Sequence, residues 1–257
     1  MKDIDDSRAP LFDHLIELRR RLLWAVATLG LCFFICFYYA SPIFSFLVQP
    51  LVKAGQGKII YTQVFEAFFV QVKVAFFAAA MIAFPVIATQ LWLFVAPGLY
   101  RQEKKALLPF LLATPILFLL GASLAYYFAI PMALKFLLSY QGDLGGIEQE
   151  ALPAVGNYLS FTMQFIMAFG IAFLMPVLIM LLERTGIVTR TQLVGMRRYM
   201  IVVAFIIAAV FTPPDVVSQL MLAVPLVALY EFTLIAIWFT EKRRAKTPKL
   251  EGPKAEG

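Results

Sequence analysis

Charged residues are scarce in this chain: they make up 15% of its 257 residues, whereas 61% are hydrophobic. A soluble globular domain is typically about half apolar and about a quarter charged. The apolar residues gather in runs long enough to cross a hydrocarbon layer of about 30 Å, which takes about 20 residues in a helix. The composition therefore argues against a soluble protein and indicates an all-α polytopic membrane protein.

Histidine and cysteine are almost absent as well. His14 is the only histidine, which argues against a histidine-rich metal site or a histidine relay. Cys32 and Cys36 lie four residues apart in an apolar run, so they share one face of a helix. A disulfide or metal site is the alternative, but we interpret both as small hydrophobic residues and expect no metal or cofactor.

Acidic pairs are missing from the centres of the apolar runs, where charge usually marks a transport pathway or a proton relay. Lys73 and Lys135 lie near the ends of runs, and Glu231 lies in the last one. No nucleophile–base pattern accompanies them. These absences argue against an enzyme. They also disfavour a small-molecule secondary transporter, the alternative function, although prolines within the runs are compatible with one.

Six runs are expected to span the membrane, of which the fifth and sixth are short: 22–40, 67–95, 107–138, 158–182, 199–211 and 217–239. Leucines recur at helical spacing in residues 1–21, which predicts an amphipathic surface helix that leads into the first span. Residues 240–257 form a basic tail that we expect to be disordered. The predicted domains are thus 1–21, 22–239 and 240–257.

Five residues are expected to shape turns and kinks. Pro50 should act as a breaker in the loop that follows the first span, a half-apolar segment that we expect to pack on the membrane surface as short helices. Pro85 should kink the second span because proline removes a backbone hydrogen bond. Pro213, Pro214 and Asp215 are expected to form a tight turn between the last two spans, since adjacent prolines do not continue a helix.

Basic residues are concentrated in the two terminal segments and in every second connection between the apolar runs. Most of the 22 lysines and arginines lie in the N-terminal segment, the 96–106 loop, the 183–198 loop and the tail. The positive-inside rule then places both termini in the cytoplasm. The net charge of +6 is therefore a signal of topology, and we expect no nucleic-acid partner.

Two carboxylates stand out in these basic regions. Glu17 lies among arginines, and Glu103 lies in an otherwise basic loop. One interpretation is structural: Glu17 pairs with Arg20 or Arg21 one helical turn away, and Glu103 is solvated. The other is a pair of carboxylates that binds a cationic ligand, because guanidinium groups bond carboxylates bidentately.

Polar side chains also occur in the later spans, namely Gln164, Thr212, Ser218 and Gln219. They form hydrogen bonds between helices of the bundle, or they dock a further transmembrane helix. The residues alone leave both interpretations open.

Several motifs together resemble the TatC family, the multispanning receptor of the twin-arginine protein translocase. They are His14–Leu22, Phe94–Tyr100 followed by Glu103, Ala168-Phe169-Gly170, and Thr212–Asp215 followed by Ser218-Gln219. They occur in the family's order, and the resemblance covers about residues 9–240.

The resemblance implies a function. TatC-like proteins bind signal peptides with two consecutive arginines at the cytoplasmic face and recruit TatA-type and TatB-type single-span subunits. The assembly, in which the receptor is expected to be a homo-oligomer in contact with lipid, moves folded proteins using the proton-motive force. By this resemblance Glu17 and Glu103 receive the arginine motif, while Arg19, Phe94 and Arg101 shape the site.

One position departs from the family pattern. Many members carry glutamate or glutamine in the fourth span where this chain has Leu174, between Phe169-Gly170 and Pro176. Leucine does not attract polar groups of a partner helix. The resemblance therefore assigns partner docking to Thr212 and Gln219, with compensation by Gln164 as the alternative.

Overall fold

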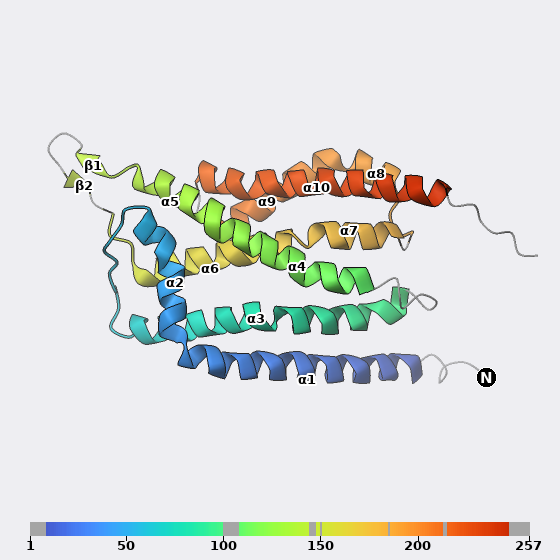
Figure 1. The fold of residues 1–257 in the computed structure, drawn as a ribbon, viewed down its shortest axis with the longest axis horizontal. Coiled ribbons are helices and arrows are strands. Elements are labelled where there is room, and N and C mark those ends of the chain that lie inside the picture. The colour runs from blue at the N-terminus through green and yellow to red at the C-terminus, as the bar shows by residue number, and fades with distance from the viewer. Residues whose placement is uncertain are drawn as a thin grey trace, which may run out of the picture.

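The computed structural model describes residues 9–99, 108–143, 148–149, 151–184, 186–212 and 215–246. Long helices lie side by side in these ranges (Figure 1). The continuous helices are α1 (Ala9–Tyr38), α2 (Ala40–Lys53), α3 (Glu66–Leu99), α8 (Arg190–Gly195), α9 (Arg197–Phe211) and α10 (Val216–Lys246). The interrupted ones are α4 (Leu108–Leu124) with the π-helix η2 (Ala125–Ala129) and α5 (Ile130–Leu138), and α6 (Val155–Ala172) with α7 (Met175–Arg184).

Five helical stretches are long and apolar enough to cross a membrane: Leu15–Tyr38, Glu66–Phe94, Phe110–Leu138, Val155–Arg184 and Val216–Lys242. They match five of the six expected spans and confirm an all-α polytopic fold. α9 covers the remaining one, but its 15 residues rise only about 22 Å. A sixth crossing therefore stays a prediction.

The last span is not short, so that prediction is wrong: the apolar stretch of α10 has 27 residues. The helix continues to Lys246, beyond the predicted start of the disordered tail at residue 240. The reason is that the hydropathy boundary is not a helix boundary. Glutamate, lysine, arginine and alanine follow soon after Phe239, and all are strong helix formers.

α1 joins the expected surface helix and the first span into one helix of 30 residues. No proline or glycine interrupts the chain between Pro10 and Gly30, so the surface helix is the first part of the spanning helix rather than a separate element. The start of α1 and the end of α10 lie at the same end of the bundle, here called the termini end, and α2 lies across the other, the α2 end (Figure 1). The side of a membrane on which the termini end lies stays a prediction.

Proline acts in two ways in this bundle. Pro176 lacks the N–H that would continue α6, so α6 ends at Ala172 and α7 begins at Met175. Pro50 was expected to interrupt the segment after the first span, which is wrong, since it lies inside α2; a short helix in this segment was expected. α3 continues through Pro85 as one helix, and a kink at this proline stays a prediction.

Two tyrosines hold α2 against the bundle. The Tyr126 hydroxyl of η2 donates to the Phe46 carbonyl at 2.6 Å, and the Tyr158 hydroxyl of α6 donates to the Leu47 carbonyl at 2.9 Å. In a helix the Phe46 carbonyl would accept from residue 50, but proline has no N–H. Tyr126 therefore supplies the donor that Pro50 lacks, which explains why a helix can contain this proline.

The core is centred on α6, whose Phe165 and Phe169 are fully buried. α1 packs on α3 through small residues, with Cys36 against Ala75 and Ala79. Both cysteines are free thiols.

A carboxylate connects the segments at the α2 end. Glu66, at the start of α3, accepts from the Gly156 N–H through Oε1 at 2.7 Å and from the Thr62 N–H through Oε2. The Val155 N–H donates to the Ile60 carbonyl at 2.9 Å. Between α5 and α6, β1 (Gly142–Asp143) pairs antiparallel with β2 (Glu148–Gln149). The Glu66 contacts fasten the start of α3 to the start of α6.

Candidate functional site

A polar cleft of about 310 Å³ lies at the termini end between α1 and α3. It is lined by Glu17, Arg20, Arg21, Trp24 and Gln90. The three charged residues come from consecutive turns of α1, and Gln90 comes from α3. The cleft thus presents one carboxylate, two guanidinium groups and an amide to a ligand.

Glu17 is partly exposed, at 34%, and is paired within its own helix. The Arg21 Nε donates to Glu17 Oε1 at 3.0 Å, and Arg21 Nη2 contacts the same oxygen. Within the described residues no hydrogen bond reaches the second oxygen, Oε2. The i,i+4 pair that the sequence suggested is therefore formed with Arg21. Such pairs contribute only about 0.3–0.5 kcal/mol, so an incoming guanidinium can replace it.

The structure brings Phe94 to the same region. A smaller cleft of about 130 Å³ lies beside the first, and Arg21 and Gln90 line both. Phe94 and Leu91 supply its apolar wall on α3. The polar cleft thus continues into an apolar one.

Arg19 does not line the polar cleft itself. It lines a shallow, mostly apolar depression of about 390 Å³ on α1, which shares Arg20 and Trp24 with the polar cleft. Residues two positions apart in a helix point about 200° away from each other, so the side chains of Arg19 and Glu17 lie on different sides of α1. The two remaining predicted site residues, Arg101 and Glu103, lie outside the described residues.

Gln90 was missed at the sequence level. The available signal was the polar pair Thr89-Gln90 within an otherwise apolar span. The Thr89 hydroxyl donates to the Pro85 carbonyl of its own helix at 2.7 Å, whereas the Gln90 side chain lines both clefts. Helical periodicity alone does not say which of the two faces α1.

The residues predicted to dock a partner helix are not gathered in one place. Gln219 Nε2 of α10 donates to the Phe205 carbonyl of α9 at 3.2 Å, and the buried Thr212 hydroxyl donates to the Ala208 carbonyl at 2.8 Å. Gln164 is exposed on α6, and Leu174 lies at the break between α6 and α7. Gln219 therefore joins two helices of the bundle.

The turn before α10 is only partly described, because Pro213 and Pro214 lie outside the described residues. Asp215 Oδ1 accepts from the Ser218 N–H at 2.7 Å, which satisfies one of the free donors at the start of α10. Asp215 Oδ2 and Ser218 Oγ are buried and have no hydrogen-bond partner in the described part of the chain.

Comparison with known proteins identifies the family. The family model for the Sec-independent protein translocase protein TatC matches residues 13–225. The TatC protein of Magnetococcus marinus is 46% identical over 96% of this chain and 90% of its own length. The TatC protein of Aquifex aeolicus is 40% identical over 88% of this chain and 93% of its own.

Solved structures agree with this match. A crystal structure described as the twin-arginine translocase receptor TatC superposes with a TM-score of 0.77 at 38% identity, and covers 89% of this chain and 99% of that one. A second, in the detergent DDM, gives a TM-score of 0.78 at 39% identity. The chain therefore belongs to the TatC family, and it is a multi-pass membrane subunit of a Sec-independent protein translocase.

Proposed function

We propose that this subunit is the receptor that binds twin-arginine signal peptides at the cytoplasmic face of a bacterial inner membrane. Both of its termini then lie in the cytoplasm, and the termini end of the bundle receives the peptide. The observation that carries the proposal is the position of Glu17, a carboxylate in a polar cleft whose ion pair with Arg21 is weak and exchangeable.

The chemistry of the cleft suits a guanidinium group. Glu17 Oε2 can accept a bond from a ligand arginine, and Oε1 becomes available when Arg21 turns away. Charge-assisted bonds of this kind are stronger than neutral ones. The apolar wall at Phe94 and Leu91 then receives the hydrophobic residues of the same peptide. We assign the second arginine to Glu103, with Arg101 beside it, on the basis of the family resemblance.

The same proposal covers the assembly. The subunit acts as a scaffold and carries out no catalysis; it recruits TatA-type and TatB-type single-span subunits, forms homo-oligomers and moves folded proteins with the proton-motive force. A small-molecule secondary transporter is not favoured, because the family is one of protein translocases.

Charge reversal at Glu17 tests the receptor role. Glu17→Lys is expected to reduce crosslinking of a twin-arginine peptide to the purified protein by about tenfold or more, since it removes a charge-assisted bond and adds repulsion. The measurement is photo-crosslinking yield against peptide concentration.

The matched control is Glu241→Lys. Glu241 is also a partly exposed carboxylate at the termini end, paired with Arg190 at 3.9 Å, but it lies on α10. This variant should crosslink like the unmodified protein. Undiminished labelling of Glu17→Lys would contradict the role of Glu17, and equal loss in both variants would show a general effect of charge.

Partner docking is tested by comparing two glutamines. Gln219→Leu removes the bond to the Phe205 carbonyl and should loosen α9, which lowers co-purification of a single-span partner by about fivefold. Gln164→Leu, on an exposed face of α6, should leave co-purification unchanged. The reverse result would move the docking site to α6.

A further inference from the structure

A lysine lies within the apolar part of the bundle. Lys73 is on α3, seven residues beyond Glu66, which places it about 10 Å along the helix from the α2 end. Its side chain is exposed, and within the described ranges no carboxylate forms an ion pair with it. A cation near a hydrocarbon layer needs an anionic partner or a path to the surface.

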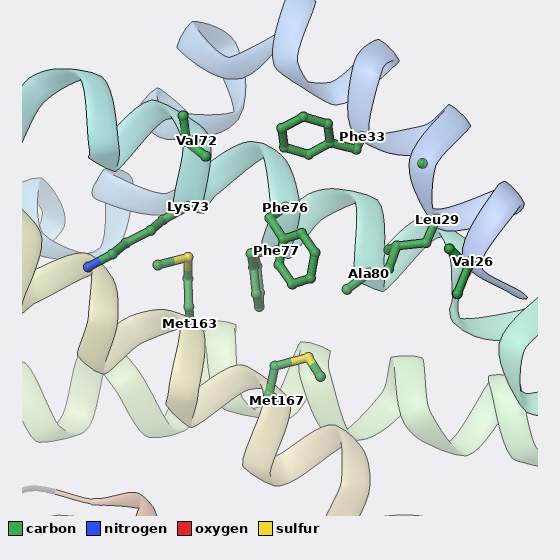
Figure 2. A pocket seen from close by; sticks show the side chains of 11 residues that line it. Val26, Leu29, Phe33, Val72, Lys73, Phe76, Phe77, Ala80, Met163 and Met167 are labelled. Atoms are coloured by element: carbon green, nitrogen blue, oxygen red, sulfur yellow. The ribbon is translucent and has the colours of Figure 1, made fainter. Parts of the chain in front are cut away.

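Lys73 forms one edge of an open groove between α1, α3 and α6, with a volume of about 710 Å³ (Figure 2). All other lining residues are apolar. Leu29 and Phe33 come from α1, Phe76 from α3, and Met163 and Met167 from α6. The figure shows Lys73 at one edge and Val26 at the far edge, with the two methionines opposite α1.

The floor of the groove at α1 is open because of Gly30. A Cβ atom built at Gly30 has no atom within 4 Å, so the missing side chain leaves free space rather than a close helix contact. The groove therefore has one charged end and a long apolar body, which is the chemical pattern of a phospholipid.

We propose that this groove binds one anionic phospholipid from the leaflet at the α2 end. The phosphate pairs with the Lys73 ammonium, and an acyl chain lies along Phe33, Phe76 and Met167. Basic pockets between transmembrane helices bind anionic headgroups at the cytoplasmic side of membranes, and the same charge attraction acts at the opposite side, where the proposed topology places the α2 end. A lipid suits the groove better than a protein helix, because a flexible chain fills an irregular apolar surface without needing complementary small residues.

The charge arm of the test is a lipid titration of the purified full-length protein in non-ionic detergent, followed by native mass spectrometry. Phosphatidylglycerol and phosphatidylcholine with identical acyl chains are the two probes. We expect the unmodified protein to prefer phosphatidylglycerol and Lys73→Gln to lower that preference about fivefold. Lys73→Arg should keep it. Lys135→Gln, an exposed lysine of α5 near the same end, is the matched control and should behave like the unmodified protein.

The apolar arm uses Gly30→Leu, which fills the groove where the structure has free space. This variant should lose binding of both lipids while its thermal unfolding stays close to that of the unmodified protein. Equal affinity for the two lipids in the unmodified protein, or an unchanged preference in Lys73→Gln, would overturn the proposal. Equal losses in Lys73→Gln and Lys135→Gln would overturn it too, since they would reflect net charge alone.

Discussion

The substitution Gly121→Ala, which adds a single methyl group, is expected to destabilise the protein by about 3 kcal/mol. It should lower the thermal unfolding midpoint by roughly 5–10 °C. Gly121 lies on α4, where that helix crosses α6. A Cβ atom there would stand 2.5 Å from the Phe169 carbonyl oxygen and 2.8 Å from Cγ of Phe173. The nearest atom belongs to the backbone of a buried helix, so it has little freedom to move.

Gly170 shows the same contact from the other helix. Its Cβ atom would lie 2.6 Å from Cε2 of Phe118, a fully buried ring of α4 that stacks on Phe84 with centroids 3.6 Å apart. The two glycines and two phenylalanines, Phe118 and Phe169, thus interlock α4 and α6. Gly170→Ala should also destabilise, by about 1–3 kcal/mol, because a side chain yields more easily than a backbone carbonyl.

Gly30→Ala is the control for both variants. It places the methyl group in open space, and alanine favours a helix over glycine by about 1 kcal/mol, so its midpoint should stay equal or rise. Thermal unfolding of the three variants in one detergent gives the comparison. An unchanged midpoint for Gly121→Ala would show that α4 and α6 can move apart at little cost, which would contradict a tight contact between them.

The sequence predicts well those features that depend on residues close together in the chain. Glu17 and Arg21 form the expected pair because the interaction is local and depends only on helical spacing. The spans were located because a run of apolar residues is a property of the chain itself. By contrast, Gly170 was recognised only as part of a family motif, since its role depends on a phenylalanine about fifty residues earlier in the chain.

The predictions that were wrong or missing concern residues whose role depends on contacts with distant parts of the chain. Pro50 is predicted to break the segment after the first span because a proline within a helix leaves one carbonyl without its donor, and the sequence does not show that Tyr126 supplies it. Gln90 was overlooked because a residue's direction within a span depends on where the neighbouring helix lies. The structure describes one part of the candidate site, in which Glu17 and Phe94 line adjacent clefts. Glu103 lies outside the described residues.

The bond between Tyr126 and the Phe46 carbonyl leads to a double-mutant prediction. Tyr126→Phe removes only the hydroxyl and keeps the ring that stacks on Phe46 with centroids 4.4 Å apart. It should cost about 2 kcal/mol, because the Phe46 carbonyl, which lies in a partly buried contact, is left without a donor. In a Pro50→Ala background the same change should cost well under about 1 kcal/mol, since an alanine at this position supplies an N–H to that carbonyl.

Tyr158→Phe is the matched control for this cycle. Its hydroxyl donates to the next carbonyl, that of Leu47, which the Leu51 N–H also reaches in a regular helix. Its cost should therefore be the same with proline or alanine at position 50. Unfolding free energies of the single and double variants measure both couplings. A cost for Tyr126→Phe that does not depend on residue 50 would mean that the hydroxyl does not replace the missing proline donor, and α2 would then need another explanation for tolerating Pro50.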